Sequence, residues 1–186
     1  MRLFLAINLP PEVRREIEAA TALLRESAPD AAWVHESRLH LTLKFLGEQP
    51  DDRVAEIQDV MAAVASRHRE IMMTLGGVGA FPNFRRARVV WLGVTPDPRL
   101  ELLHHDLEVA CERLGFEIEG RPFRPHLTLA RVKHPLPDPS LRALARVARK
   151  TAYRTDFIVR SFDLMQSVLG ASGPAYSTLV SAALRS

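Results

Sequence analysis

Two identical tetrapeptides, His-Leu-Thr-Leu, hold the residues of this sequence that are best suited to proton transfer. The first begins at His40, in HLTLKFLG, and the second at His126, in HLTLAR, 86 positions later. Counting from the composition, about 0.005 such tetrads are expected by chance. A single copy would be typical of an ordinary half-buried strand. The repetition indicates instead that two halves of one site are built on the same template.

Each tetrad is predicted to form a β-strand, which fixes where its side chains point. Alternate side chains of a strand share a face, so His40 and Thr42 point one way while the two leucines enter a core. His126 and Thr128 do the same in the second strand. Two histidines at opposite ends of a reacting group are what general acid–base catalysis near neutral pH requires. Because threonine hydroxyls can donate hydrogen bonds to phosphoryl oxygens, the four side chains predict a cleft for a phosphate ester.

Further candidates for contact with a substrate are Lys44, Phe81, Arg88, Arg131 and Tyr176. By alternation, Lys44 shares the face of the first histidine, whereas Arg131 reaches the cleft only if its strand bends or ends there. Phe81 and Arg88 flank a loop that interleaves aromatic and basic side chains, a pattern that suits base stacking and phosphate contact. Tyr176 either stacks on a base or fills a lobe.

The positive charge of the chain is modest overall but consists mainly of arginine. Net charge is +3, and 22 of the 25 basic residues are Arg. The planar fork of arginine bonds two phosphate oxygens at once, although a GC-rich gene would produce the same excess. A helix predicted over residues 139–150 carries Arg142, Arg146, Arg149 and Lys150. A solvated basic face is favoured there, and an accessory RNA-binding patch is the alternative.

The sequence predicts no metal site and no disulfide. No Asp, Glu or Cys stands beside either histidine at the spacing of a metal ligand. The one cysteine, Cys111, falls on the apolar side of a predicted helix and is expected to be a small buried hydrophobe. No apolar run is long enough to span a membrane, and the N-terminus lacks the pattern of a secretory signal. A cytoplasmic protein is therefore expected.

The elements that must position the tetrads are predicted from hydrophobic periodicity. At 186 residues the chain suits one domain or two small intimate lobes. The strands are expected at 2–9, 39–46, 71–81, 88–94, 124–132, 157–169 and 175–184, and the helices at 12–26, 52–68, 98–114 and 139–150. This order predicts a mixed α+β fold with antiparallel pairing. The order of strands and helices roughly repeats, as though one unit had been duplicated.

The paired tetrads resemble the motifs of the two-histidine phosphoesterase superfamily. Within it, the chain is similar to the bacterial and archaeal RNA 2′,3′-cyclic phosphodiesterases, also known as 2′-5′ RNA ligases. The resemblance covers nearly the whole chain and rests on RLFLAINLP, WVHESRLHLTLKFLGE, GVGAFPNFRRARVVWLGV, RPFRPHLTLARVK and SVLGASGPAYSTL, in that order.

The resemblance implies a single bilobed catalytic domain over residues 1–186. Two antiparallel sheets, flanked by helices and related by a pseudo-twofold, would each contribute one tetrad to a central cleft, without metal or other cofactor. It implies hydrolysis of an RNA 2′,3′-cyclic phosphate end to a 2′-phosphomonoester, with His40 as proton donor and His126 as proton acceptor. A 5′-hydroxyl in place of water would give 2′-5′ ligation.

Two other functions stay open at this point. One is a module that binds RNA ends or nucleotides without turnover, and the other is a phosphodiesterase for small cyclic nucleotides. Nothing apolar and exposed stands out in the sequence, so a monomer is expected.

Overall fold

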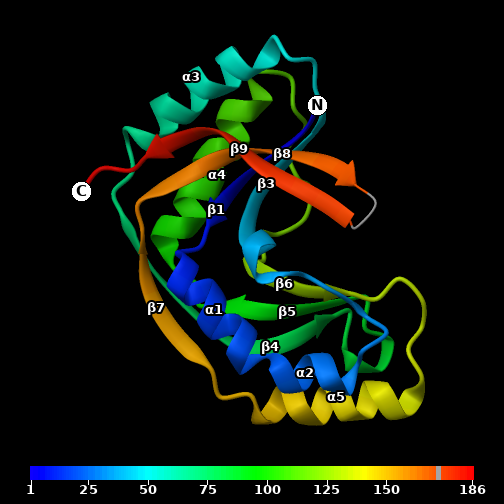
Figure 1. The fold of residues 1–186 in the computed structure, drawn as a ribbon. Helices are drawn as coiled ribbons and strands as arrows, with labels where there is room; N and C mark the ends of the chain where they lie inside the picture. The colour runs from blue at the N-terminus through cyan, green and yellow to red at the C-terminus, as the bar shows by residue number, and fades with distance from the viewer. Residues whose placement is uncertain (171–172) are drawn as a thin grey trace.

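The computed structural model describes residues 1–170 and 173–186 (Figure 1). Its strands are β1 (Arg2–Asn8), β2 (Ala32–Trp33), β3 (His40–Glu48), β4 (Ile71–Phe81), β5 (Val89–Val94), β6 (His126–Arg131), β7 (Arg154–Val159), β8 (Ser161–Gly170) and β9 (Gly173–Ala183). Its helices are α1 (Pro11–Ala20), α2 (Ala22–Ser27), α3 (Arg53–Ala65), α4 (Pro98–Glu112) and α5 (Asp138–Lys150), with the 3-10 turns η1 (Glu36–Arg38) and η2 (Phe84–Arg86). The predicted α+β order is confirmed, except that two elements are divided and the two-residue strand β2 was not predicted.

The helix predicted over residues 12–26 is interrupted at Thr21, between α1 and α2. The buried hydroxyl of Thr21 donates a hydrogen bond to the carbonyl oxygen of Ile17 at 2.8 Å, and bonds of this kind to the preceding turn often bend a helix. The strand predicted over 157–169 is divided at Arg160 into β7 and β8, which pair with β4 and β1 respectively. The buried face shifts by one residue at this break, since Phe157 and Val159 are buried in β7 whereas Phe162 and Leu164 are buried in β8.

All the strand pairings are antiparallel and form one curled sheet in the order β7-β4-β5-β6-β3-β1-β8-β9, with β2 added beside β6. The prediction of two separate sheets is therefore wrong in this respect. The two halves meet where β3 pairs with β6 through Leu41 and Leu127 alone. Since β3 and β6 would otherwise be the exposed inner edges of two sheets, this pairing joins them.

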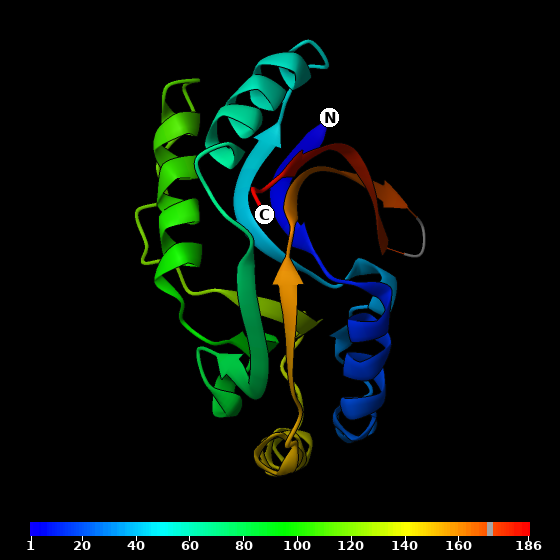
Figure 2. The same ribbon diagram turned by 90° about the vertical axis from the view of Figure 1, so that its left-hand side faces the viewer.

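The two tetrad strands therefore lie side by side at the centre of the sheet (Figure 1). Helices α3 and α4 pack together and cover the half that contains β3 and β9, whereas α2 and α5 pack together on the half that contains β4 (Figures 1 and 2). The buried core includes Leu41 and Leu43 of the first tetrad and Leu127 and Leu129 of the second. As predicted, the leucines turn inward and leave His and Thr on the opposite face.

No helix in the described part of the chain is both long and apolar enough to cross a membrane.

Candidate active site

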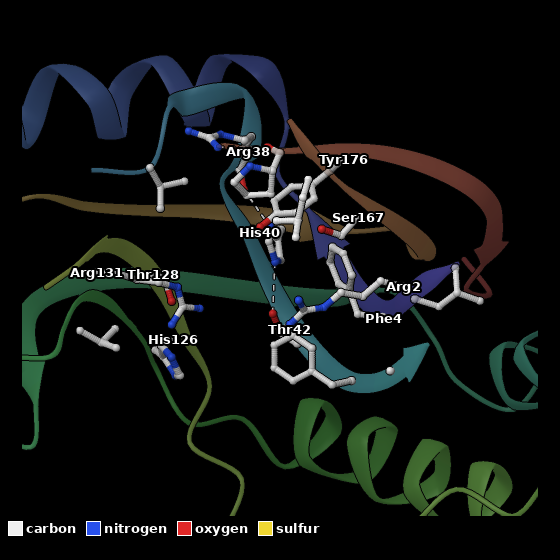
Figure 3. Close-up of a pocket in the computed structure, with 17 residues that line it drawn as sticks. Arg2, Phe4, Arg38, His40, Thr42, His126, Thr128, Arg131, Ser167 and Tyr176 are labelled. Carbon is white, nitrogen blue, oxygen red and sulfur yellow. Dashed lines mark hydrogen bonds between the residues drawn. The ribbon is translucent and has the colours of Figure 1, made fainter. Parts of the chain in front are cut away.

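A cavity of about 620 Å³ lies over the centre of the sheet, and both tetrads line it (Figure 3). His40 and Thr42 enter it from β3, and His126 and Thr128 enter it from β6. The structure thus brings together the four side chains that the sequence predicts to share a cleft. The full lining is Arg2, Leu3, Phe4, Val34, Arg38, His40, Thr42, Phe45, Gly47, Val89, His126, Thr128, Arg131, Ser167, Leu169, Pro174 and Tyr176.

The cavity has a strongly positive lining. Three arginines supply this charge, while none of the described lining residues is Asp or Glu. Apolar side chains, among them Phe4, Phe45 and Leu169, complete the wall. An anionic group attached to a flat apolar body, such as a nucleotide, matches this combination of charge and apolar surface.

The two imidazoles are held in the same way. His40 Nδ1 lies 2.8 Å from the carbonyl oxygen of Arg38, and His126 Nδ1 lies 2.7 Å from that of Arg124. A carbonyl oxygen only accepts, so each Nδ1 carries the hydrogen. In the neutral ring, Nε2 is then the free nitrogen, available to accept a proton or, once protonated, to give one. His40 Nε2 also lies 3.1 Å from Thr42 Oγ1 (Figure 3).

An aromatic ring supports each imidazole. Phe81 stands edge-on to His126 with ring centroids 5.0 Å apart, and Tyr176 stands edge-on to His40 at 5.3 Å. Phe4 packs against His40 from a third side at 5.0 Å. Packing of this kind locks the rotamer of a side chain that must hold a reacting geometry.

The pKa of His40 is lowered, mainly because burial disfavours the charged ring. The hydrogen bond to the Arg38 carbonyl acts in the opposite direction and raises it. The positive charges of Arg131 and Arg14 lower it further. Without an anion in the cavity, the first histidine is therefore held toward its neutral form.

Each tetrad strand contains a β-bulge at the same place. In β3, the residues opposite Leu5 and Ala6 are Lys44 and Thr42, so that Leu43 is the extra residue. In β6, the corresponding extra residue is Leu129. A bulge reverses the alternation of side chains beyond it. Two residues after each bulged leucine, Phe45 and Arg131 therefore turn into the cavity.

The prediction that Lys44 faces the cleft is wrong, because the bulge turns it to the opposite side of the sheet. Its side chain is only 5% exposed, and Nζ lies 2.8 Å from Glu108 Oε2 and 2.8 Å from the Glu117 carbonyl oxygen. Glu108 also accepts the backbone N–H of Glu119 at 2.9 Å. Lys44 thus joins β3 to α4 and to the segment that leads toward β6.

The other candidate contacts divide between the lining and its surroundings. Arg131 and Tyr176 line the cavity. Phe81 stands behind His126 and does not line the cavity itself. Arg88 is exposed just before β5 and does not line the cavity, whereas its neighbour Val89 does.

Sequence reasoning missed several lining residues, and four of them carry a charged or aromatic side chain: Arg2, Phe4, Arg38 and Phe45. Strict alternation assigns Phe45 to the face away from the cavity, and the bulge in β3 reverses that assignment. The other three left a signal in the sequence. Arg2 and Phe4 alternate with buried leucines in β1, and Arg38 precedes His40 by two residues, as Arg124 precedes His126.

Within residues 1–170 and 173–186, no group of three or more His, Cys, Asp or Glu side chains lies close enough together to hold a metal ion. Cys111 is buried, as expected, and burial raises the pKa of its thiol to about 11.

Comparison with known proteins identifies relatives over the whole length of the chain. The family model described as the 2′-5′ RNA ligase superfamily matches residues 9–171. An RNA 2′,3′-cyclic phosphodiesterase of Geobacillus stearothermophilus is 38% identical over 128 residues, which are 69% of this chain but only 41% of that protein. The enzyme of the same name from Archaeoglobus fulgidus is 34% identical over 96% of this chain and 98% of its own length.

A solved structure adds the same relationship in three dimensions. The crystal structure of E. coli LigT complexed with 3′-AMP is 30% identical to this chain and superposes with a TM-score of 0.76, covering 98% of this chain and 97% of LigT. With a family model that spans most of the sequence and relatives that match it from end to end, the chain belongs to the 2′-5′ RNA ligase superfamily.

Proposed function

We propose that this protein is an RNA 2′,3′-cyclic phosphodiesterase that hydrolyses the cyclic phosphate end of an RNA to a 2′-phosphomonoester without a metal ion. The observation that carries the proposal is the pair of imidazoles, each anchored through Nδ1 to a backbone carbonyl, in one cavity lined by three arginines. Relatives named for this activity match the chain over almost its entire length. We assign the whole chain to one bilobed catalytic domain whose halves are related by a pseudo-twofold.

In the proposed reaction, His126 takes a proton from water as the water oxygen bonds to phosphorus. The bond from phosphorus to the 3′ oxygen breaks, and His40 gives its proton to that oxygen, leaving a 3′-hydroxyl and a 2′-phosphate. Thr42 and Thr128 donate hydrogen bonds to phosphoryl oxygens, and the Arg131 guanidinium offsets their charge. The order of the two histidines follows the family resemblance, since the two tetrads are identical. A 5′-hydroxyl that replaces water gives 2′-5′ ligation by the same steps.

The side chains of Phe45 and Tyr176 are suited to contact the terminal nucleoside of the RNA. Phe45 is 64% exposed although it is a large apolar side chain, and it lines the cavity on the side where β3 continues. An exposed aromatic ring beside a phosphate site is a platform on which a base can stack. The protein's partner is then an RNA with a cyclic phosphate end, or a nucleotide of the same chemistry. Because one chain supplies both tetrads, we propose a monomer, acting in the cytoplasm.

A second candidate is a phosphodiesterase for small cyclic nucleotides, which the size of the cavity favours. A volume of about 620 Å³ lies in the range of small-molecule sites and accommodates a mononucleotide. Turnover of a cyclic mononucleotide that equals or exceeds turnover of an oligonucleotide would favour this candidate.

The direct test uses a short RNA ending in a 2′,3′-cyclic phosphate, incubated with the protein in excess EDTA. Release of a 2′-phosphate end is the expected result. A 3′-phosphate end would overturn the assignment of the broken bond, and loss of activity in EDTA would overturn the metal-free mechanism. If the RNA bound but stayed intact, the protein would be a binding module.

A further inference from the structure

Nine basic residues are concentrated in two segments of the chain, one of which begins at the cavity residue Arg131. Residues 84–88 and 131–150 contain nine Lys or Arg and a single acidic residue, Asp138. The other 161 residues contain 16 Lys or Arg against 21 Asp or Glu, so their net charge is negative. The nine residues are Arg85, Arg86, Arg88, Arg131, Lys133, Arg142, Arg146, Arg149 and Lys150, and we refer to them as the basic surface.

The fold brings these two segments together although they are far apart in the sequence. Turn η2, which carries Arg85 and Arg86, packs against α5. The backbone N–H of Val132 donates to the carbonyl oxygen of Arg88 at 2.9 Å, so the stretch that leaves β6 runs beside the stretch that enters β5. In Figure 1, α5 extends along the lower edge of the half that contains β4 and β5. One continuous region of the surface therefore carries both sets of charges.

On α5 the charges occupy the side that faces away from the core. Arg142, Arg146 and Arg149 follow each other at i, i+4 and i+7, a spacing that places them on one helix face. All three are exposed, whereas Leu144 and Ala148 are buried on the other face. The three side chains form a row about 10 Å long along the helix axis.

Among the residues that the structure describes, none of these charges takes part in an ion pair. In the described part of the chain, every ion pair involves other residues, among them Lys44, Arg53, Arg99 and Arg160. Crowding unpaired like charges destabilises the compact state through mutual repulsion. Such a concentration is more readily explained by an anionic partner than by the stability of the fold.

The basic surface and the cavity share one residue. Arg131 belongs to both, since it ends β6 and lines the cavity beside Thr128 (Figure 3). A polymer whose terminal phosphate lies between His40 and His126 can leave the cavity past Arg131 and reach Lys133, η2 and α5.

We propose that the basic surface binds the phosphodiester backbone of the RNA, 5′ to the nucleotide whose cyclic phosphate lies in the cavity. This inference rests on the proposed function and specifies its substrate as an oligonucleotide or longer RNA. Contacts of this kind neutralise phosphates and release counterions, so they act regardless of sequence and weaken as salt increases. A mononucleotide, which ends at the cavity, gains nothing from them.

The test compares two double variants that remove equal charge. Arg142→Ala/Arg146→Ala alters the basic surface, and Arg15→Ala/Arg113→Ala alters exposed arginines on α1 and after α4. Binding of a twelve-nucleotide RNA with a 2′-phosphate end is measured by fluorescence anisotropy over a range of salt. Because each lost contact lowers the slope of log Kd against log salt by about 0.7, the first variant should lower it by about 1.4 and weaken binding roughly tenfold at physiological salt. The second variant should leave both quantities unchanged.

Hydrolysis of a cyclic mononucleotide is the accompanying control, and both variants should match the unmodified protein there. Equal losses of RNA affinity in the two variants, or no loss in either, would overturn the inference. If no cyclic phosphate is hydrolysed by the unmodified protein, the proposed function fails, yet the binding comparison still decides whether this surface contacts RNA.

Discussion

His40 and His126 line the cavity rather than the core, so their removal should affect chemistry more than folding. We expect His40→Ala and His126→Ala each to lower kcat for a cyclic phosphate by roughly 10²- to 10⁴-fold, the usual contribution of a positioned acid or base. His105→Ala, on the exposed side of α4, is the matched control and should retain full turnover. Near-normal kcat in either cavity variant would contradict the acid–base assignment.

The lowered pKa of His40 should move when an anion binds. Bound phosphate offsets the positive charges of Arg131 and Arg14, which lower the pKa of His40 in the free protein, so binding should raise it. By linkage, binding then takes up a proton at His40 in the pH range between the pKa values of the free and bound protein. NMR titration of the His40 ring with and without 2′-AMP measures the shift. An unchanged or lowered His40 pKa in the complex would show that this coupling is absent.

Removing the positive charge of Arg131 should also raise the pKa of His40, in this case in the free protein. In Arg131→Gln, one of the charges that lower the pKa of His40 is gone, so the His40 titration should shift upward without any ligand. The same NMR experiment checks it, and a downward shift would contradict the electrostatic account.

At the scale of the elements, the bulge in β3 places the adjacent residues Lys44 and Phe45 on opposite faces of the sheet. Lys44 lies in a buried ion pair with Glu108, and breaking such a pair from one side leaves an uncompensated charge. Lys44→Met should therefore lower the free energy of unfolding by about 3–5 kcal/mol, as measured by urea denaturation, yet preserve kcat at temperatures where the variant is folded. Lys44→Met/Glu108→Gln should recover part of the loss. A large fall in kcat with normal stability would instead indicate contact with substrate.

Phe45, one residue further along, should show the reverse pattern. Because its ring is 64% exposed, Phe45→Ala should hardly change stability, but loss of base stacking should raise KM for a cyclic phosphate RNA by about tenfold. Leu102→Ala, at 54% exposed on α4, is the control and should leave KM unchanged. A normal KM in Phe45→Ala would remove this ring from the proposed binding site.

The same bulges explain how far the sequence alone can predict this site. Alternation places His and Thr of each tetrad correctly, because nothing interrupts the strand over those three residues. Beyond the fourth residue it assigns Lys44 and Arg131 to the wrong faces, since both local patterns fit an unbroken strand equally well. The family resemblance implied two lobes with a central cleft, whereas the pairing of β3 with β6 that makes one sheet depends on contacts 86 residues apart. No periodicity within one strand encodes such a contact.

At the scale of the whole molecule, that pairing sets how the two tetrads face each other. Leu127 is fully buried at the junction, between His126 and Thr128. Leu127→Ala should cost about 2–5 kcal/mol of stability, like other buried leucines, and should also lower kcat, because the relative position of the halves changes. Leu107→Ala in α4, equally buried, should destabilise similarly without that fall in kcat. Equal effects of the two variants on kcat would contradict a special role for the junction.

The charge of the cavity has a consequence for the rate of successive turnovers. Opening a cyclic phosphodiester converts a group with one negative charge into a monoester that approaches two at neutral pH. A lining with three arginines, and no Asp or Glu among its described residues, attracts the doubly charged group more strongly. The protein should therefore hold its product more tightly than its substrate. Departure of the 2′-phosphate end would then limit the steady-state rate, and accumulating product would inhibit the reaction.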